Sequence, residues 1–215
     1  MEFKDAIKKC EDRKIRRTVE ALKKNHIEAF YAKTPEEAVI IFKDLVRENS
    51  VVTAGGCMTS IERVIVEILI SGLYNYIDRE RPGIIPVEVQ VGQIQAFTAD
   101  YFITGTNAIT EKGELFNIDG NGNRVAAISY GPKEVIVIAG SNKIVRDAEE
   151  ARKRVKEISA PANAMRLDCN TPCTIDGICR NCASEKRICC TEVLTGYQRI
   201  KNRIKVIIVD GDFGF

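Results

Sequence analysis

The sequence contains one histidine, His26, and no run of 18 consecutive apolar residues. A single histidine, placed by the pattern at a helix–strand junction, argues against a Ser-His-Asp triad and against a metal site built on histidine. The nearest candidate for a membrane span, VIVEILISGLYNYI, is too short and carries Glu67, so no membrane partner is expected. The N-terminal segment lacks the apolar core of a signal peptide, and we therefore expect a cytoplasmic protein.

An excess of charge of either sign is also absent. Lys and Arg number 32, Asp and Glu number 30, and the two signs are interspersed, which gives a net charge of +2. Nucleic acid is therefore not an expected partner, because sequence-independent affinity comes from neutralising phosphates. An apolar fraction of 45% in 215 residues is enough for one large domain spanning residues 1–215, and it excludes a disordered chain.

The hydrophobic pattern predicts an α/β fold with a mostly parallel sheet flanked by helices. Strands and helices alternate in the first half, and Thr34 with Glu37 forms a capping box. Helices are expected at 3–24, at about 34–48, at 61–71, at 89–97 and after Asp147. Strands are expected at 27–32, 51–54, 101–105, 134–140 and 205–210, and the segment 106–133 is expected to contain short strands, such as 114–118, joined by tight turns at DGNGN, 119–123.

A glycine loop, GGCMTS at 55–60, lies between a predicted strand and a predicted helix. Glycines permit a tight turn, and the free N–H groups at a helix start attract anions. The candidate contacts to a carboxylate or phosphate are Gly55, Gly56, Cys57 and Thr59. The alternative is a tight turn without a ligand, and Cys57 is then a tolerated small residue rather than a reactive thiol.

Polar residues are concentrated in the segment that follows. Amides and hydroxyls beside an arginine suit a hydroxy or keto acid, with Arg124 as a bidentate carboxylate contact, although tight turns use the same residue types. Lys143 follows a buried strand, where ligands of open α/β sheets bind. The candidates are Gly105, Asn107, Thr110, Asn117, Asp119, Asn123, Arg124 and Lys143. Acid–base chemistry would need a carboxylate, and Glu62, Glu111 and Asp119 are equal candidates.

Six of the eight cysteines fall between Cys169 and Cys190, with spacing C-x3-C-x5-C-x2-C-x6-C-C. In a chain that can build a core and is expected to be cytoplasmic, clustered thiols favour a metal site over a disulfide or redox-thiol patch. Zinc and a [4Fe–4S] cluster both fit four cysteines. Two C-x2-C pairs would favour zinc, but the segment has only one, which slightly favours an iron–sulfur cluster over zinc.

The long segment ADYFITGTNAITEKGELFNIDGNGNRVAAISYGPKEVIVIAGSNKIV resembles the lactate-utilization (LUD) domain family. GGCMTSIE and the terminal GDFGF fit the same family, and the resemblance extends over about 19–215. It implies a fold like that of sugar-phosphate isomerases and CoA-transferases, and it suggests a link to lactate-type organic-acid oxidation. The family's tail pattern matches Cys173, Cys179, Cys182 and Cys189 as metal ligands within a cysteine-rich insertion at 169–190.

The resulting hypothesis is a LUD-like protein that binds a small anionic metabolite and carries a cysteine-ligated metal centre. Any catalysis would be organic-acid redox chemistry, with an electron-transfer protein as partner, and a homo-oligomer is left open. One fold hosts many functions, so the resemblance does not establish a reaction. The alternative is a non-catalytic accessory or scaffold subunit in which the metal is structural.

Overall fold

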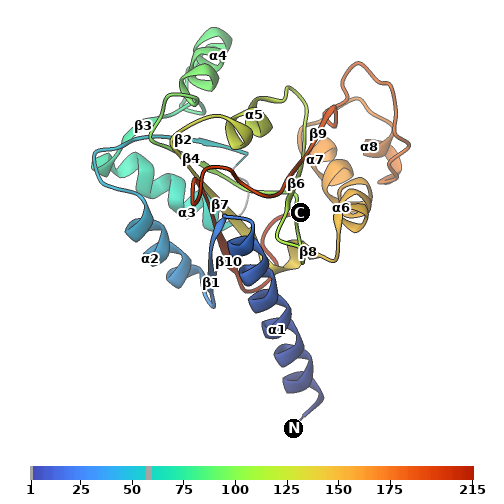
Figure 1. Ribbon diagram of the computed structural model, residues 1–215. Helices are drawn as coiled ribbons and strands as arrows, with labels where there is room; N and C mark the ends of the chain where they lie inside the picture. The colour runs from blue at the N-terminus through green and yellow to red at the C-terminus, as the bar shows by residue number, and fades with distance from the viewer. Residues whose placement is uncertain (1, 57–59) are drawn as a thin grey trace.

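A six-stranded parallel sheet forms the centre of the computed structural model, which describes residues 2–56 and 60–215, without the side chain of Ser60 (Figure 1). The strand order is β1-β10-β7-β4-β2-β3, and every neighbouring pair is parallel. The strands are β1 (Glu28–Ala32), β2 (Val51–Gly55), β3 (Asn75–Ile77), β4 (Tyr101–Thr104), β7 (Glu134–Gly140) and β10 (Ile204–Val209). The predicted α/β class and parallel sheet are confirmed.

Both faces of this sheet are buried, which explains the near-continuous apolar run of β7. Val135 and Val137 belong to the core cluster on one face, whereas Ile136 and Ile138 belong to the cluster on the other. A strand covered on both sides needs apolar residues at every position, because successive side chains point to opposite faces. The run EVIVIAG therefore forms a central strand, as its composition predicted.

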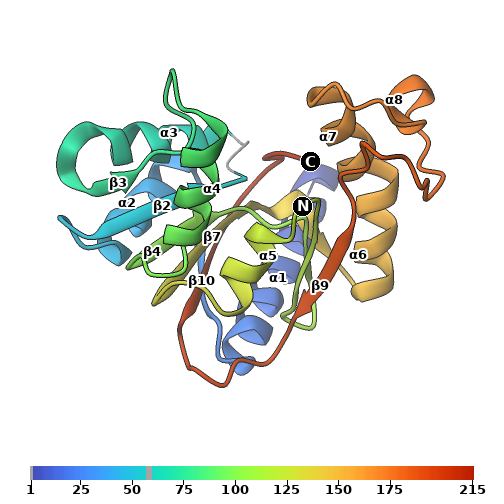
Figure 2. The ribbon, with the colours of Figure 1, turned by 90° about the horizontal axis from the view of Figure 1, so that it is seen from above.

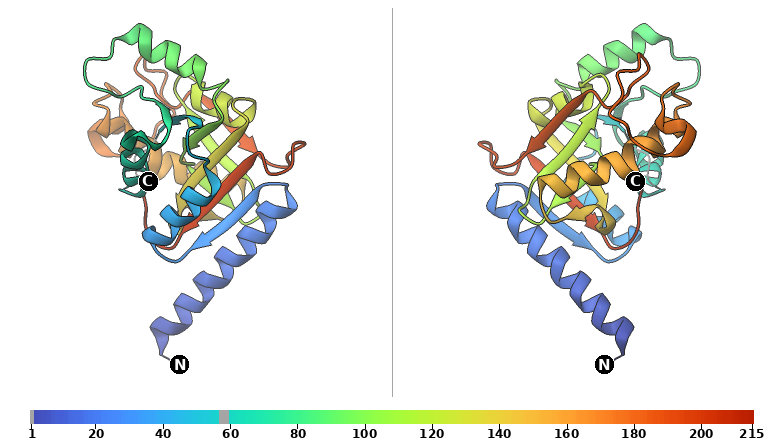
Figure 3. Two further views of the ribbon diagram at one scale, coloured as in Figure 1. Left: turned by 90° about the vertical axis from the view of Figure 1, so that its left-hand side faces the viewer. Right: turned by 90° about the vertical axis from the view of Figure 1, so that its right-hand side faces the viewer.

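Helices cover the two faces separately (Figure 2). Helices α2 (Pro35–Leu45) and α3 (Ser60–Ile68) pack on one face through Phe42 and Ile65, among others. Helices α1 (Phe3–Lys24) and α5 (Asn123–Ser129) pack on the other, and the first turns of α1 project away from the body of the protein (Figure 3). The Thr34 hydroxyl accepts a 3.2 Å hydrogen bond from the Glu37 amide, so the predicted cap of α2 is confirmed.

The protein also contains a second sheet of four strands. Its order is β8-β5-β6-β9, formed by β8 (Ile144–Val145), β5 (Ala108–Thr110), β6 (Leu115–Asp119) and β9 (Thr191–Thr195). Of these strands only β6 was predicted by its residues, at 114–118. One face packs on the central core, and the other packs on α6 (Ala148–Arg154) and the π-helical turn η3 (Val155–Ser159) through Phe116 and Val155. Helix α7 (Ala160–Arg166) continues from η3. These strands are too short for their periodicity to stand out in the sequence.

Three expectations about the helices were wrong. The segment 106–133, expected to hold short strands joined by tight turns, also contains helix α5. Helix α4 (Pro86–Gln95) begins earlier than predicted, because Pro86 opens it and the Glu88 carboxylate accepts a 3.1 Å hydrogen bond from the Ile85 amide. Helix α3 ends at Ile68 and passes into a π-helical turn, η1 (Leu69–Leu73), in which Gly72 has a positive φ of 93°. Among the described residues, no helix is both long and apolar enough to cross a bilayer.

Candidate functional site

A cleft of about 610 Å³ opens beyond the carboxyl ends of the parallel strands. Gly56 follows β2, Gly105 follows β4 and Lys143 follows β7, and all three residues line it. Gly56, at the start of the glycine loop, and the segment after β4 therefore lie at one edge of the sheet, as the order of strands predicted. Of the predicted contacts, the cleft is lined by Gly56, Gly105, Asn107, Asp119, Asn123, Arg124 and Lys143, together with Glu62.

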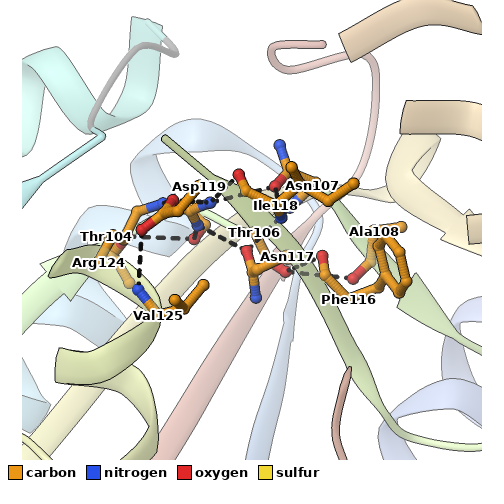
Figure 4. A network of polar contacts seen from close by, with 11 residues as sticks. Thr104, Thr106, Asn107, Ala108, Phe116, Asn117, Ile118, Asp119, Arg124 and Val125 are labelled. Atoms are coloured by element: carbon orange, nitrogen blue, oxygen red, sulfur yellow. Dashed lines mark hydrogen bonds and ion pairs between the residues drawn. The ribbon is translucent and has the colours of Figure 1, made fainter. Parts of the chain in front are cut away.

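Arg124 lies at the centre of a polar network in one wall of this cleft (Figure 4). Its Nε donates to Asp119 Oδ1 at 2.8 Å. Nη1 donates to the Gly105 carbonyl at 3.2 Å and to Asn117 Oδ1 at 2.6 Å. Nη2 donates to Asn107 Oδ1 and to the Ile118 carbonyl, each at 3.1 Å. All five N–H groups of the guanidinium are thus used within the protein, so Arg124 shapes the wall and does not present the open fork expected from the sequence.

The network joins the two sheets through its two asparagines. Asn107 follows β4 of the parallel sheet, and Asn117 lies in β6 of the second sheet. Asn107 Oδ1 also accepts a 2.9 Å hydrogen bond from the Ile118 amide, and Asn117 Oδ1 accepts one of 3.3 Å from the Asn107 amide. Asn117 is 1% exposed, and its Nδ2 has no hydrogen-bond partner within the described part of the chain. Asn117 supports the wall from behind and does not itself line the cleft.

Asp119 connects this network to the start of helix α5. Its Oδ2 accepts a 3.0 Å hydrogen bond from the Val125 amide in the first turn, while Oδ1 holds Arg124. The residue before the helix, Gly122, has a φ of 76°, which favours glycine. The Asp-Gly-Asn-Gly-Asn stretch therefore ends β6 and starts a helix, where the sequence was interpreted as turns alone. Both carboxylate oxygens of Asp119 are engaged, which makes it a poor proton carrier.

Lys143 and Glu62 form the charged centre of the cleft. Lys143 is 5% exposed, and its amine forms no hydrogen bond or ion pair with any residue that the structure describes. Burial lowers the pKa of Lys143 to about 8; the charges of Arg154 and Arg124 lower it as well, and the charge of Glu62 raises it. Glu62 is 1% exposed, and of the predicted carboxylates it is the one whose charge acts on Lys143.

The carboxylate of Glu62 approaches the end of β4 closely at Gly105. A Cβ atom on Gly105 would lie 2.5 Å from Glu62 Oε1, far inside van der Waals contact. The absence of a side chain at Gly105 therefore lets the carboxylate approach the strand end. Of the three candidate carboxylates, this geometry selects Glu62 for chemistry in the cleft.

Other predicted residues lie elsewhere or outside the described chain. Glu111 pairs with Arg17 of helix α1 at 3.1 Å and does not line the cleft. Thr110 donates to Glu114 at 2.9 Å inside the second sheet. Gly55 ends β2 without lining the cleft. Cys57 and Thr59 lie outside the described residues, so their predicted contacts stay predictions.

Several lining residues had no signal in the sequence. Asn163 and Arg166 of helix α7 and Arg187 of the cysteine-rich segment line the cleft, and so does Glu80 of the loop after β3. Helix α7 and the cysteine-rich segment are far in the sequence from the strand ends, and only tertiary packing brings their residues to the cleft (Figure 2). Besides Asp119 and Arg124, the charged side chains that line the cleft in the described chain are those of Lys143, Arg166, Arg187, Glu62 and Glu80.

The four cysteines expected to bind metal line one small cavity beside the cleft. Cys173, Cys179, Cys182 and Cys189 all contribute to a space of about 20 Å³. Arg187 donates to the Cys182 and Cys189 carbonyls, each at 2.7 Å, and lines both this cavity and the cleft. In the residues that the structure describes, no three His, Cys, Asp or Glu side chains are close enough to share one ion. Metal binding would therefore require the segment 177–190 to draw the thiols together.

The thiols differ in their surroundings. Hydrogen bonds from the Ser184 hydroxyl and amide lower the pKa of Cys182, while burial raises the pKa of Cys189. The Thr171 hydroxyl lies 3.3 Å from Cys173 Sγ. Apart from α8 (Cys173–Asp176), the segment from 169 to 190 contains no helix or strand.

Comparisons with known proteins agree with this architecture. A crystal structure of a DUF162 family protein from Deinococcus radiodurans superposes with a TM-score of 0.53 at 16% sequence identity, covering 94% of this chain and 98% of that one. At this identity the likeness shows the fold alone. No curated protein matches the chain. The LUD domain matches residues 15–209, which include both sheets and the cysteine-rich segment. The chain therefore belongs to the LUD domain family.

Proposed function

We propose that this LUD-domain protein binds a small anionic metabolite, a hydroxy acid, a keto acid or a phosphate, in the cleft at the strand ends. The observation that carries the proposal is Lys143, a buried cation in the wall of an open cleft, without an ion pair among the described residues. Burying an ammonium group is unfavourable unless a charge or hydrogen bond compensates it. A bound anion would supply that compensation together with Glu62.

The second wall supports the same proposal. Arg187 donates to the Cys182 and Cys189 carbonyls, to the Asn181 side chain and to the Cys189 thiol, so at least one of its five N–H groups has no partner in the described chain. Arg166 donates only to the Asn163 side chain, through Nε and Nη2. Both guanidiniums therefore keep donors for a carboxylate or phosphate, which Arg124 does not.

The test is calorimetric titration with L-lactate, pyruvate and inorganic phosphate. At least one should bind the wild type, and Lys143→Met should abolish that binding without lowering the free energy of unfolding, because it removes a buried charge. Lys201→Met is the matched control, since Lys201 is an exposed lysine in the turn before β10, at the opposite edge of the sheet. Equal affinity of wild type and Lys143→Met would contradict the proposal.

For the cysteine-rich segment we propose a metal centre, zinc or [4Fe–4S], ligated by Cys173, Cys179, Cys182 and Cys189. The support is that all four thiols line one cavity. An iron–sulfur cluster would lie next to the cleft and could accept electrons from a lactate-type oxidation. An electron-transfer partner would then take these electrons away. Zinc would instead favour the alternative, an accessory subunit with a structural site.

Metal analysis of protein purified without exposure to air separates these outcomes. Brown protein containing iron and sulfide supports the redox role, whereas colourless protein with one zinc supports the accessory role. Cys179→Ser combined with Cys182→Ser should then remove the metal and speed hydrogen exchange over 165–195. Stoichiometric free thiols with no metal would refute the metal centre and leave anion binding in the cleft untouched.

A further inference from the structure

We propose that the Lys143 amine forms a covalent imine with the carbonyl carbon of a 2-oxo acid held in the cleft. This inference rests on the proposed anion binding and names the chemistry that follows it. A lysine amine reacts selectively with a bound carbonyl compound when it lies at a binding cavity, is not held in a hydrogen bond, and has a nearby group that carries protons. Lys143 and its neighbours provide these three features.

The position of Lys143 is fixed by the fold. It belongs to the short 3₁₀ turn η2 (Ser141–Lys143) that directly follows β7, the strand between β10 and β4 near the centre of the sheet. It lines the cleft while being only 5% exposed, so most of its surface is packed against the protein. Within the described chain no hydrogen bond occupies its amine.

Charged groups on three helices surround the amine. Arg124 of α5 and Arg154 of α6 disfavour its protonated form, and Glu62 of α3 favours it. The largest effect is burial, and together these influences bring the pKa of Lys143 to about 8. Roughly a tenth of the amine is then neutral at pH 7, compared with fewer than about one in a thousand for an exposed lysine. Lysines desolvated in this way are the ones that serve as nucleophiles.

The reaction needs no oxidant or second substrate. The nitrogen lone pair attacks C2 of the oxo acid, and the carbonyl oxygen takes up a proton to give a carbinolamine. The C–O bond then breaks, the hydroxyl leaves with a proton as water, and a C=N bond remains. Glu62 is placed to accept the proton lost by nitrogen and to return it to the departing hydroxyl.

The cations of the opposite wall would orient the substrate. Arg166 and Arg187 line the same cleft and have donors to spare for the carboxylate. A 2-hydroxy acid presents the same carboxylate but no electrophilic carbon, so it would bind reversibly without reacting. The chemistry therefore separates the oxo acids from the hydroxy acids at one site.

Reductive trapping tests the inference directly. The full-length protein is incubated with pyruvate and sodium cyanoborohydride, and the adduct is located by peptide mass spectrometry. We expect one adduct per chain, at Lys143, with a rate that rises with pH and levels off above about pH 8. Exposed lysines should react more slowly, with rates still rising toward pH 10. L-lactate should yield no adduct and should slow trapping by competition.

Three variants distinguish covalent chemistry from simple anion binding. Lys143→Arg keeps a cation in the cleft but cannot form the imine, so it should lose the adduct completely. Glu62→Gln should still be labelled at Lys143, at least ten-fold more slowly and with an altered pH profile. Lys201→Arg removes an exposed lysine and should behave as the wild type.

Two results would overturn the inference. One is labelling spread over the exposed lysines at equal rates; the other is no adduct at Lys143 under saturating pyruvate. Calorimetry without the reductant shows separately whether pyruvate, lactate or phosphate binds. Binding without trapping refutes the imine alone, whereas absence of both refutes the proposed function as well.

Discussion

Arg124 Nε and Asp119 Oδ1 are joined by a 2.8 Å hydrogen bond in a largely buried ion pair, with side-chain exposures of 13% and 9%. The pair fastens the end of β6 to the first turn of α5, and through Gly105 it fastens both to the end of β4. The guanidinium of Arg124 thus connects the two sheets at the place where the cleft opens. The site depends on this arrangement even though Arg124 has no donor left for a ligand.

Arg124→Lys should lower the free energy of unfolding by about 2 kcal/mol or more. Lysine keeps the charge but cannot reproduce the five hydrogen bonds of the guanidinium, and several acceptors would be left buried without a donor. Urea unfolding monitored by circular dichroism measures the change. Arg166→Lys, at an exposed residue bonded only to Asn163, should change stability by less than about 0.5 kcal/mol. Equal losses in the two variants would argue against the structural role of the network.

Gly105→Ala should destabilise the protein by about 1–3 kcal/mol, because the added methyl group would collide with the Glu62 carboxylate. It should also slow trapping at Lys143, since Glu62 would be displaced. Gly196→Ala is the control: its nearest neighbour would be Glu114 Cγ at 3.9 Å, and no strain is expected. Thermal unfolding of both variants gives the comparison, and a Gly105→Ala protein as stable as the wild type would show that the carboxylate lies elsewhere.

Stability should depend on pH through Lys143. Its pKa is about 8 in the folded protein and 10.5 when exposed, so below pH 8 the lysine is charged in both states and its burial is fully unfavourable. Between pH 8 and 10.5 the unfolded chain binds more protons, and stability therefore rises with pH. Relative to Lys143→Met, the wild type should gain about 3 kcal/mol across this interval.

Urea unfolding at pH 7.5, 9 and 10 measures this gain. Lys201→Met should show no trend relative to the wild type, because that lysine is exposed. A constant difference between wild type and Lys143→Met at all three pH values would mean that the amine is not desolvated.

The cysteines should differ in reactivity in the metal-free, reduced protein. Iodoacetamide should alkylate Cys182 faster than Cys189 at pH 7.5, because hydrogen bonds from Ser184 lower the pKa of Cys182 and burial raises that of Cys189. Peptide mass spectrometry over time gives both rates. Ser184→Ala should reduce the advantage of Cys182 without altering Cys189. Faster alkylation of Cys189 would show that the segment 177–190 has a different conformation in solution.

Periodicity and local chemistry were sufficient for five of the six strands of the parallel sheet, all but β3, and for much of the cleft. Three features could be recognised locally in the sequence: the apolar run of β7, the Thr34 cap of α2 and the glycine after β4. Each of them depends on residues that are close together in the chain. The order of strands and loops then brought Gly56, Gly105 and Lys143 to one edge. The family was also evident in the long central motif, which the match over 15–209 includes.

Only the tertiary structure decided what those residues do. Arg124 had the spacing of a ligand contact, yet packing against Asp119, Asn107 and Asn117 uses every donor it has. Glu62 could not be chosen over Glu111 until the fold placed one beside Lys143 and the other beside Arg17. Arg166 and Arg187 left no local signal, because a position on the far wall of a cleft arises from contacts between distant segments. The sequence determined which elements form and where the strand ends meet, and long-range packing determined which side chains face the cleft.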